Sequence, residues 1–553
     1  MRFAWWVVGV AMLLVPFPMV ASQVVPPTIV YTGRFITLDS ARPRVAAIAV
    51  RAGRIVALGS RREVEAVAGA AADHQALPGF ILPGLADAHA HATSLGDLLG
   101  QLDLRSRSKA QIIAAVRAAA STAAPGSWIR GGGWDQAFWR PAVYPTAADL
   151  DSVSGGHPVV LDRIDGHAIW VNSRALELAR LSSAVPDPEG GRIIRDAMGR
   201  PTGVLVDHAA GAVTEMIPAP SGPERERRLR AALRQYAAWG FTSVHDAGVG
   251  LEEIAAYHAI ASQGPLPVRI YAMASANDSV LTSVLARGPE IGTADGTFAL
   301  RSVKIVLDGA LGSRGAELAA PYSDAPAESG LSLLSDARLD SIIARSAARG
   351  FQVNVHAIGD RANHRALDAF ERAGPAARRL RFRVEHASMV RDEDVPRFAS
   401  LGVIASMQPV FVGEYSRFAE DRVGKVRLPW VYRTRDLLDA GAVVAAGTDF
   451  PASDAGDAVS NLFAMVTRRG ADGTPVAGWL PGQRVGVGAA LRAMTSSAAY
   501  AGFGEQDVGI LTVGRRADFT VLSADPTRMA PDRLRQLKVL RTVVGGRMTY
   551  LGR

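Results

Sequence analysis

Two histidines separated by one residue, His89 and His91, follow an apolar run at residues 80–82. Positions i and i+2 of a strand point to the same face, so these two side chains are expected to lie side by side. Neutral imidazole is the commonest protein ligand for zinc-like ions, and two imidazoles at the end of a buried strand can bind one metal ion. Taken alone, a His-x-His pair is more often two ordinary surface or core histidines. The rest of the chain must decide between these interpretations.

Four further titratable side chains lie in or directly after strand-like apolar runs. Lys304 lies within one such run, and three other runs lead to His356, His386 and Asp449. Each has an ordinary explanation, such as an ion pair between Lys304 and Asp308, a hydrogen-bonded core histidine, or a helix cap at Asp449. Together with the leading histidine pair, however, they make six potential ligands at the same end of successive strands. We interpret this coincidence as a predicted metal site.

The elements that must position these residues alternate between apolar strand-like runs and helical stretches rich in Ala, Leu and Arg, such as residues 225–239 and 339–349. This alternation is typical of repeated βα units and a parallel sheet. Eight such units close into a barrel whose chemistry lies at the C-terminal ends of the strands. We therefore predict an α/β fold with a (β/α)8 TIM-like barrel. After the strand that leads to His89, its strands are expected at residues 241–244, 268–273, 303–307, 351–355, 380–385, 402–406 and 443–447.

The two ends of the chain have a different texture. Short β-rich runs with glycine turns occupy residues 28–38 and 45–59, and they return only at residues 509–522 and 539–550. Each end is too short to form a core alone, so we predict one small β-sandwich domain built from both. The expected organisation is a composite small domain at residues 23–82 and 500–553, a barrel at residues 83–499, and within it a large insertion at about residues 93–235, far longer than a normal βα loop.

The N-terminus has the order of a secretory signal. Arg2 is followed by an apolar segment to about Val20, broken by Pro16 and Pro18, and then by the small residues before Gln23. This order predicts a signal peptide at residues 1–22, cleavage and export, with the bacterial periplasm as the expected location. An uncleaved membrane anchor is the competing interpretation, since the segment is just long enough. After cleavage no stable membrane anchor is expected.

Composition places the chain among globular proteins with a large core, since 48% of its 553 residues are hydrophobic and 21% are charged. The net charge of +8 comes from 61 basic and 53 acidic residues, without a basic run of the kind that binds nucleic acid. No nucleic-acid partner is expected. Cysteine is absent, which excludes disulfides. Lysine occurs only at Lys109, Lys304, Lys425 and Lys538, so one of four lysines lies in an apolar strand.

With these residues in view, the chain resembles the amidohydrolase superfamily, and most closely its amidohydrolase-3 branch of YtcJ-like and N-substituted formamide deformylase-like proteins. The resemblance covers nearly all of the chain after the signal. The motifs that carry it are Pro83-Gly84 leading to His89-Ala90-His91, Gly131-Gly132-Gly133-Trp134-Asp135, residues 163–168 (RIDGHA), Lys304 with residues 308–314 (DGALGSR), residues 355–360 (VHAIGD), Glu385-His386-Ala387, residues 447–451 (GTDFP) and residues 514–519 (GRRADF).

The resemblance implies two divalent metal ions, with zinc as the expected metal. A pair of cations needs an anionic bridge, which a free lysine cannot supply because it is cationic and has no acceptor. In the family a lysine on the fourth strand takes up carbon dioxide to become a carbamate, and Lys304 matches that position. An unmodified Lys304 with a single metal remains the alternative. By resemblance, His89, His91 and Asp449 bind the first ion, His356 and His386 the second, and carbamylated Lys304 both.

The implied activity is hydrolysis of the C–N bond of a small-molecule amide, whether N-acyl, N-formyl or cyclic. A water between two cations loses a proton near neutral pH and becomes the nucleophile. Asp449 is the expected catalytic base and acid. Two alternatives stay open: a mononuclear deaminase of the same superfamily, and a catalytically inactive secreted binding protein. The deaminase would carry a glutamate where this chain has Gly359. A homodimer is a possible assembly.

The insertion is expected to form a lid or pocket wall over the barrel mouth. We predict substrate contacts from Trp134, Asp135, His167, Asp308 and Arg314. His167 is the expected carbonyl-polarising or polar-group contact. The alternative for the tryptophans is that Trp134, Trp139 and Trp170 build the insertion's own core. The pair His245-Asp246 receives no ligand role.

Overall fold

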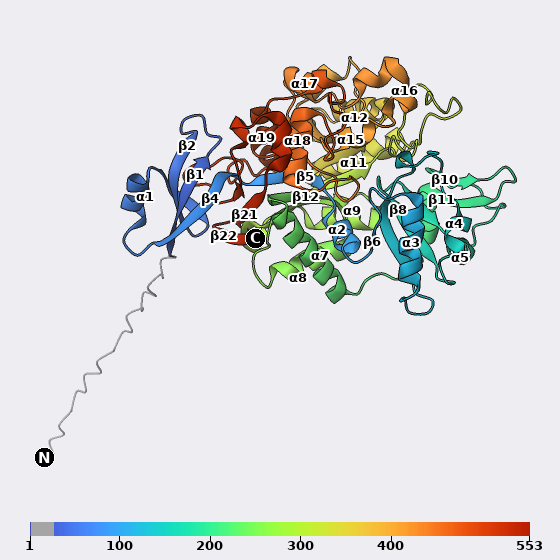
Figure 1. Cartoon of the computed structure of the whole chain (residues 1–553). Coiled ribbons are helices and arrows are strands. Elements are labelled where there is room, and N and C mark those ends of the chain that lie inside the picture. Colours follow the sequence, from blue (N-terminus) through green and yellow to red (C-terminus); the bar gives the residue numbers. More distant parts are fainter. Residues whose placement is uncertain (2–26, 553) are drawn as a thin grey trace.

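The computed structural model describes residue 1 and residues 27–552 (Figure 1). The predicted signal segment lies outside the described residues, apart from its first residue. Within the described part of the chain, none of the helices combines the length and the apolar character needed to cross a bilayer.

Eight parallel strands form the central barrel, which confirms the predicted fold class. Successive strands pair in the order β19-β18-β17-β16-β15-β13-β12-β5. The two end strands, β5 and β19, are joined just past β19 by backbone hydrogen bonds from Asp449 to His89 (2.7 Å) and from His91 to Phe450 (3.0 Å). The barrel strands are β5 (Leu85–Ala90), β12 (Phe241–Val249), β13 (Arg269–Ser275), β15 (Phe298–Val306), β16 (Gln352–Ala357), β17 (Arg383–His386), β18 (Ile404–Met407) and β19 (Val444–Ala446).

Helices surround the barrel and bury its outer apolar face. Two of them match the predicted helical stretches: α7 begins at Ser221 as N-cap, followed by Pro223, and α11 begins at Ser335 as N-cap. The helices of this part are α2 (Ala92–Leu98), α7 (Gly222–Ala238), α8 (Leu251–Ala261), α9 (Asp278–Arg287), α10 (Thr293–Gly296), α11 (Asp336–Ala348), α12 (Asp360–Arg372), α13 (Pro375–Arg379), α14 (Val395–Leu401), α15 (Phe411–Tyr415), α16 (Ala419–Arg427), α17 (Thr434–Asp439), α18 (Ala458–Thr467), α19 (Val487–Ala493) and α20 (Ser496–Ala501).

The apolar run at residues 80–82 and the histidine pair lie on two different strands, which corrects the expectation of one continuous strand. The run belongs to β4 (Asp73–Pro83) of the small sheet, and β5 begins at Leu85. The chain passes from one sheet to the other at Gly84. A Cβ there would lie 2.0 Å from Oγ1 of Thr242, so only glycine permits this close approach.

The small sheet combines both ends of the chain. Its seven strands follow the order β22-β21-β20-β4-β1-β2-β3, so N-terminal and C-terminal strands meet where β4 pairs with β20. The sheet is curved, so that Tyr31 of β1 donates a hydrogen bond to the carbonyl of Gly546, in the turn between β21 and β22. Within the β-rich run at residues 509–522 only the end is a strand. The remaining elements are β1 (Thr28–Ile36), β2 (Arg44–Arg51), β3 (Arg54–Gly59), α1 (Arg61–Ala68), β20 (Phe519–Leu522), β21 (Val539–Val544) and β22 (Arg547–Leu551).

The segment between α2 and α7 forms a third sheet, with strand order β10-β11-β9-β8-β7-β6. Figure 1 shows this insertion (teal) and the small sheet (blue) on opposite sides of the barrel. Helix α7, which falls inside the range predicted for the insertion, packs against α8 and β12 of the barrel. The insertion contains β6 (Leu102–Asp103), α3 (Lys109–Ala120), β7 (Ile129–Trp134), α4 (Ala147–Asp151), β8 (Val159–Arg163), β9 (Ala168–Val171), α5 (Ser173–Leu178), β10 (Gly191–Arg195), β11 (Pro201–Asp207) and α6 (Gly211–Thr214).

Candidate metal centre and pocket

The six predicted ligands converge at the C-terminal mouth of the barrel. Nε2 of His89 lies 3.2 Å from Nζ of Lys304 and 3.2 Å from Oδ1 of Asp449. Nε2 of His91 lies 3.0 Å from the same Asp449 oxygen. These four residues come from β5, from the start of α2, from β15 and from the loop after β19, so the fold brings together positions that span 360 residues of sequence.

The other two predicted ligands complete the cluster. The ring centroid of His386 lies 4.9 Å from that of His89 and 4.4 Å from that of His356. One ligand atom from each of His89, His386 and Asp449 lies within 4.8 Å of the others. His356 joins this group through its contact with His386.

The hydrogen bonds of the leading histidines leave their Nε2 atoms, which face Asp449, as acceptors. Nδ1 of His89 lies 2.5 Å from a Glu385 carboxylate oxygen, and Nδ1 of His91 lies 2.9 Å from the carbonyl of Ala247. An acceptor at each Nδ1 fixes the proton there, which leaves a lone pair on each Nε2. Both lone pairs face Oδ1 of Asp449, which is itself an acceptor. Such an arrangement requires a cation or a proton between the groups.

Unpartnered buried atoms give an independent test of whether a metal fits. Nε2 of His356, Nδ1 of His386 and Oδ1 of Asp449 are buried and make no hydrogen bond within the described residues. Buried polar atoms are almost always hydrogen-bonded, so three orphans in one cluster call for a ligand. Imidazole nitrogens and a carboxylate oxygen are the donor set that zinc-like ions prefer. The residues therefore fit a metal.

Backbone strain accompanies these ligands. His386 and Asp449 have φ of 75° and 60°, in the left-handed region that non-glycine residues rarely adopt. Such conformations persist only where the surrounding structure enforces them, and they concentrate at functional sites. His386 is the last residue of β17 and Asp449 lies three residues after β19, so both occur where the chain turns at the mouth of the barrel.

Electrostatics in the cluster favours ligand forms that can bind a cation. Burial opposes the charge of Asp449, but the interactions with His89 and His91 outweigh it and hold its pKa well below its ordinary value. Burial lowers the pKa values of His356 and His386 well below the usual range, so both imidazoles are neutral. Burial also lowers the pKa of Lys304, against the opposing charges of Glu385 and Asp449.

A buried ion pair beneath the ligands was missed at the sequence level. Glu385 holds His89 through one oxygen and pairs with Arg383 at 2.7 Å through the other. Arg383 also bonds to the carbonyl of Ala88 (2.6 Å) and to His245 (3.0 Å), so His245 supports this layer rather than the cluster itself. The available signal was the pair of charged residues at alternate positions of a short buried strand.

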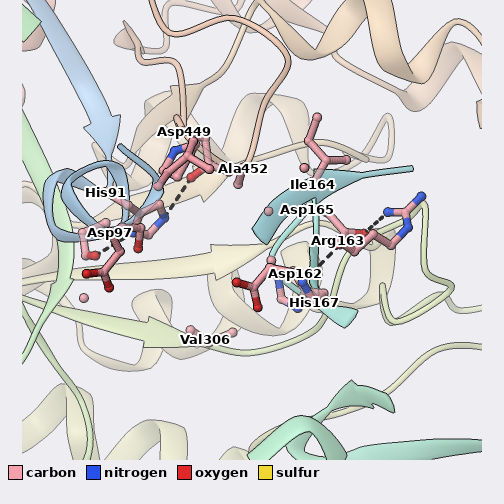
Figure 2. Close-up of a pocket in the computed structure, with 18 of the residues that line it drawn as sticks. His91, Asp97, Asp162, Arg163, Ile164, Asp165, His167, Val306, Asp449 and Ala452 are labelled. Atoms are coloured by element: carbon pink, nitrogen blue, oxygen red, sulfur yellow. Dashed lines mark hydrogen bonds and ion pairs between the residues drawn. The ribbon is translucent and has the colours of Figure 1, made fainter. Parts of the chain in front are cut away.

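A cavity of about 500 Å³ opens beside the cluster. The candidate ligands form one end of it, and the insertion forms the facing wall. Figure 2 shows His91, Asp97 and Asp449 on one side and Asp162, Asp165 and His167 on the other. The residues from the insertion include Arg130, Gly132, Asp162, Arg163, Asp165 and His167.

A second cavity of about 30 Å³ lies behind the first. It shares His356, His386 and Asp449 with the larger one and is closed by the aromatic side chains of Phe411, Tyr415 and Phe418.

Two of the predicted substrate contacts line these cavities. His167 lines both, and its Nδ1 lies 2.6 Å from an Asp207 carboxylate oxygen. Burial opposes protonation of His167, but Asp207 outweighs it and raises the pKa to about 9. Asp135 lines the smaller cavity and forms an ion pair with Arg163 at 2.5 Å.

The structure places the other three predicted contacts away from both cavity linings. Trp134 lies in the core of the insertion with Trp139 and Trp170, and its indole donates to the carbonyl of Leu161 at 2.7 Å. Asp308 is buried and accepts backbone hydrogen bonds from residues 317, 358 and 359, so it fixes the loop after His356. Arg314 pairs with Asp324 at 2.9 Å. The direction of Trp134 follows from its position in β7, and that of Arg314 from its ion pair with Asp324. The sequence motifs alone do not show either cause.

The position that separates hydrolase from deaminase is sterically closed. A Cβ on Gly359 would lie 1.9 Å from the carbonyl oxygen of Glu317. No carboxylate side chain can therefore occupy this place without moving the loop.

Comparison with known proteins agrees with this geometry. The model of the family described as "Amidohydrolase family" matches residues 79–550. The chain is 32% identical to Protein LONG AFTER FAR-RED 3 of Arabidopsis thaliana (96% of this chain, 92% of the relative). It is 31% identical to the putative amidohydrolase YtcJ of Bacillus subtilis (94% and 99%) and 27% identical to the N-substituted formamide deformylase of Arthrobacter pascens (93% and 96%).

A solved structure is similar over the same extent. The crystal structure of an uncharacterized metal-dependent hydrolase from Pyrococcus horikoshii superposes with a TM-score of 0.75 at 26% identity, covering 91% of this chain and 99% of that one.

Proposed function

This chain belongs to the amidohydrolase family, and on that premise we propose that it hydrolyses the C–N bond of a small amide with the help of bound metal. The observation that carries the proposal is that three acceptor atoms face one another. Nε2 of His91 and Nε2 of His89 lie 3.0 and 3.2 Å from Oδ1 of Asp449. Only a cation or a proton reconciles these atoms.

We propose zinc as the metal and two ions as its number. His89, His91 and Asp449 would hold the first ion, and His356 and His386 the second. Nζ of Lys304 lies 3.2 Å from Nε2 of His89, and its charge also acts on His356 and His386. As a carbamate, formed when the amine adds carbon dioxide and loses a proton, it would supply the anionic oxygens that a pair of cations needs. When bound, the metal supplies Lewis acidity, which polarises a carbonyl and lowers the pKa of water.

The chain's own residues then move the protons. Oδ1 of Asp449 faces the two histidines, which leaves Oδ2 to accept the proton of the attacking water and pass it to the leaving nitrogen. Nδ1 of His167 is engaged by Asp207, and the raised pKa keeps a proton on Nε2. From its place on both cavities, that N–H can donate to the substrate carbonyl oxygen.

The sizes of the two cavities favour a small acyl group. A single water molecule needs a cavity of roughly 10–15 Å³. The small cavity beside His386 measures about 30 Å³, so it accommodates about two non-hydrogen atoms. A formyl group, with two non-hydrogen atoms, fits this space; an acetyl group exceeds it by one atom, and a longer acyl chain meets the aromatic side chains. The 500 Å³ cavity receives the amine portion. The name of the Arthrobacter pascens relative, an N-substituted formamide deformylase, agrees with a formyl group.

The test is a substrate series on the zinc- and manganese-loaded protein. N-formyl, N-acetyl and N-hexanoyl derivatives of one amine are compared, and amine release and metal content are measured. We expect two equivalents of metal, turnover of the short acyl groups, and loss of about 10²–10⁴-fold in kcat for Asp449→Asn with its fold retained. One equivalent of metal with ammonia release from an amidine-type ring would favour a deaminase, and absence of both metal and turnover would favour a binding protein.

A further inference from the structure

The insertion wall of the large cavity carries two charged side chains on one face of its sheet. Strands β7 and β8 run parallel, with Gly132 opposite Asp162. Arg130 lies two residues before Gly132 and therefore on the same face. Both Arg130 and Asp162 line the cavity, and Gly132 has no side chain to fill the space beside them.

These two groups differ from three other charged residues that line the cavity, Asp97, Arg105 and Arg163, which are paired. Asp97 pairs with Arg228 at 2.7 Å, Arg105 with Asp103 at 2.5 Å, and Arg163 with Asp165.

Within the described residues, Arg130 has no carboxylate within ion-pair distance. Its only partner is the Gln101 side-chain oxygen, once that amide is turned, at 3.0 and 3.3 Å from its two terminal nitrogens. The side-chain carboxylate of Asp162 makes no hydrogen bond or ion pair with the described residues either. Cavity-facing charges without an oppositely charged protein partner indicate groups that a ligand completes.

The pair lies apart from the metal cluster. The charged groups near enough to influence Asp162 are Arg130 and Asp97, and neither is a candidate ligand. Burial raises the pKa of Asp162 to about 6, with Arg130 acting in the opposite direction, so at neutral pH the carboxylate is mostly ionised. The insertion wall thus carries one cationic and one anionic side chain that do not form an ion pair with each other.

We propose that Arg130 and Asp162 bind a zwitterionic amino-acid group at the far end of the substrate. Arg130 would receive its carboxylate through parallel N–H donors, and Asp162 its ammonium group. This inference rests on the proposed function and narrows it: the preferred substrates are short N-acyl derivatives of the side-chain amine of a diamino acid. The acyl group occupies the small cavity and the amino-acid end reaches the insertion wall.

Four matched compounds separate the two charges. Nε-formyl-lysine carries both, 6-formamidohexanoate only the anion, N-formylcadaverine only the cation, and N-pentylformamide neither. The formylated ornithine and diaminobutyrate series repeat the comparison with shorter spacers. We expect kcat/KM for the zwitterion to exceed that for the uncharged compound by about tenfold to a hundredfold, as for a charge-assisted contact.

Two variants and a control assign the effect to residues. Arg130→Gln should lower kcat/KM for the two compounds with a carboxylate and leave N-pentylformamide unchanged. Asp162→Asn should lower it only for the two with an ammonium group. Arg174→Gln, a surface arginine of the insertion in an exposed pair with Glu177, is the control and should change none of them.

The outcomes distinguish this inference from the proposed function. Equal kcat/KM for charged and uncharged compounds at every spacer length, or equal loss on all four compounds in Arg130→Gln, overturns the inference and leaves the hydrolase in place. Absence of turnover for all compounds overturns the hydrolase. In that case, saturable binding of free L-lysine by calorimetry, lost in Arg130→Gln, would still support the zwitterion site, and no binding would overturn it as well.

Discussion

Glu385→Gln tests whether the buried ion pair positions His89, a candidate metal ligand. Glu385 and Arg383 have no exposed side-chain area, and one carboxylate oxygen lies 2.5 Å from Nδ1 of His89. Glutamine keeps the size and shape of the side chain but removes its charge. The exchange therefore perturbs the proton on Nδ1 and the compensation of Arg383 without opening a cavity.

Two effects of different size are expected. Loss of an outer-shell carboxylate on a metal-binding histidine weakens metal affinity by roughly 10–100-fold, which is about 1.4–2.7 kcal/mol. Leaving Arg383 buried without its partner destabilises the fold by about 3–5 kcal/mol, out of a total near 5–15 kcal/mol. The variant should therefore fold at 25 °C with a lowered Tm and reduced zinc affinity.

The assay keeps these effects apart. Zinc affinity is measured on the folded protein by competition with a chromophoric chelator, and stability by urea unfolding in excess chelator. Glu505→Gln is the matched control, because Glu505 forms a two-point pair with Arg381 (2.7 and 2.9 Å) but its side chain is 30% exposed, and exposed pairs contribute about 0–1 kcal/mol. It should leave zinc affinity unchanged.

The pH dependence gives a further readout. Burial opposes the charge of Glu385, but Arg383 and His89 outweigh it and hold its pKa well below the ordinary 4.5. Its stabilisation of the metal-free protein is therefore complete above pH 4.5 and is lost as the pH falls below that value. The free energy of unfolding of metal-free Glu385→Gln should therefore fall less between pH 4.5 and lower pH than that of the wild type. Wild-type zinc affinity in a folded Glu385→Gln protein would refute the positioning role.

Three other perturbations follow from the structure. Removing metal with a chelator should lower Tm, and added zinc at about 1,000 times its Kd should restore roughly 4 kcal/mol of stability, whereas a Tm insensitive to zinc would contradict a bound metal. Trp134→Phe removes the hydrogen bond to Leu161 and should destabilise the fold by about 1–3 kcal/mol without changing KM, and a changed KM would return Trp134 to the pocket wall. Burial and the nearby Asp454 raise the pKa of Glu414 well above 4.5, so its carboxyl weakens the fold as the pH rises above that value; Glu414→Gln should therefore gain more Tm at pH 8 than at pH 5, and equal gains would argue against the buried acid.

The barrel and the convergence of the six ligands were predictable because their cause is local. Each ligand lies in the last residues of an apolar strand or just after one, and parallel strands bring their C-terminal ends to one edge. The supporting contacts were not predictable. Glu385 and Arg383 meet His89 across the barrel, and Trp134 turns into the insertion's core because of strand register. Even the first strand was misplaced, since Gly84 carries the chain between sheets only because Thr242 faces it there.

The seam that closes the barrel explains why the metal centre and the fold depend on the same atoms. Asp87 of β5 accepts hydrogen bonds from the backbone N–H and hydroxyl of Thr448, at 2.9 and 2.6 Å. The next residue, Asp449, donates its N–H to the carbonyl of His89. Gly447 permits this approach, because a Cβ there would lie 2.4 Å from the backbone nitrogen of His89. The first and last strands are thus joined at the residues that face the metal, so a side chain at Gly447 would separate His89 from Asp449 and weaken the fold and metal binding together.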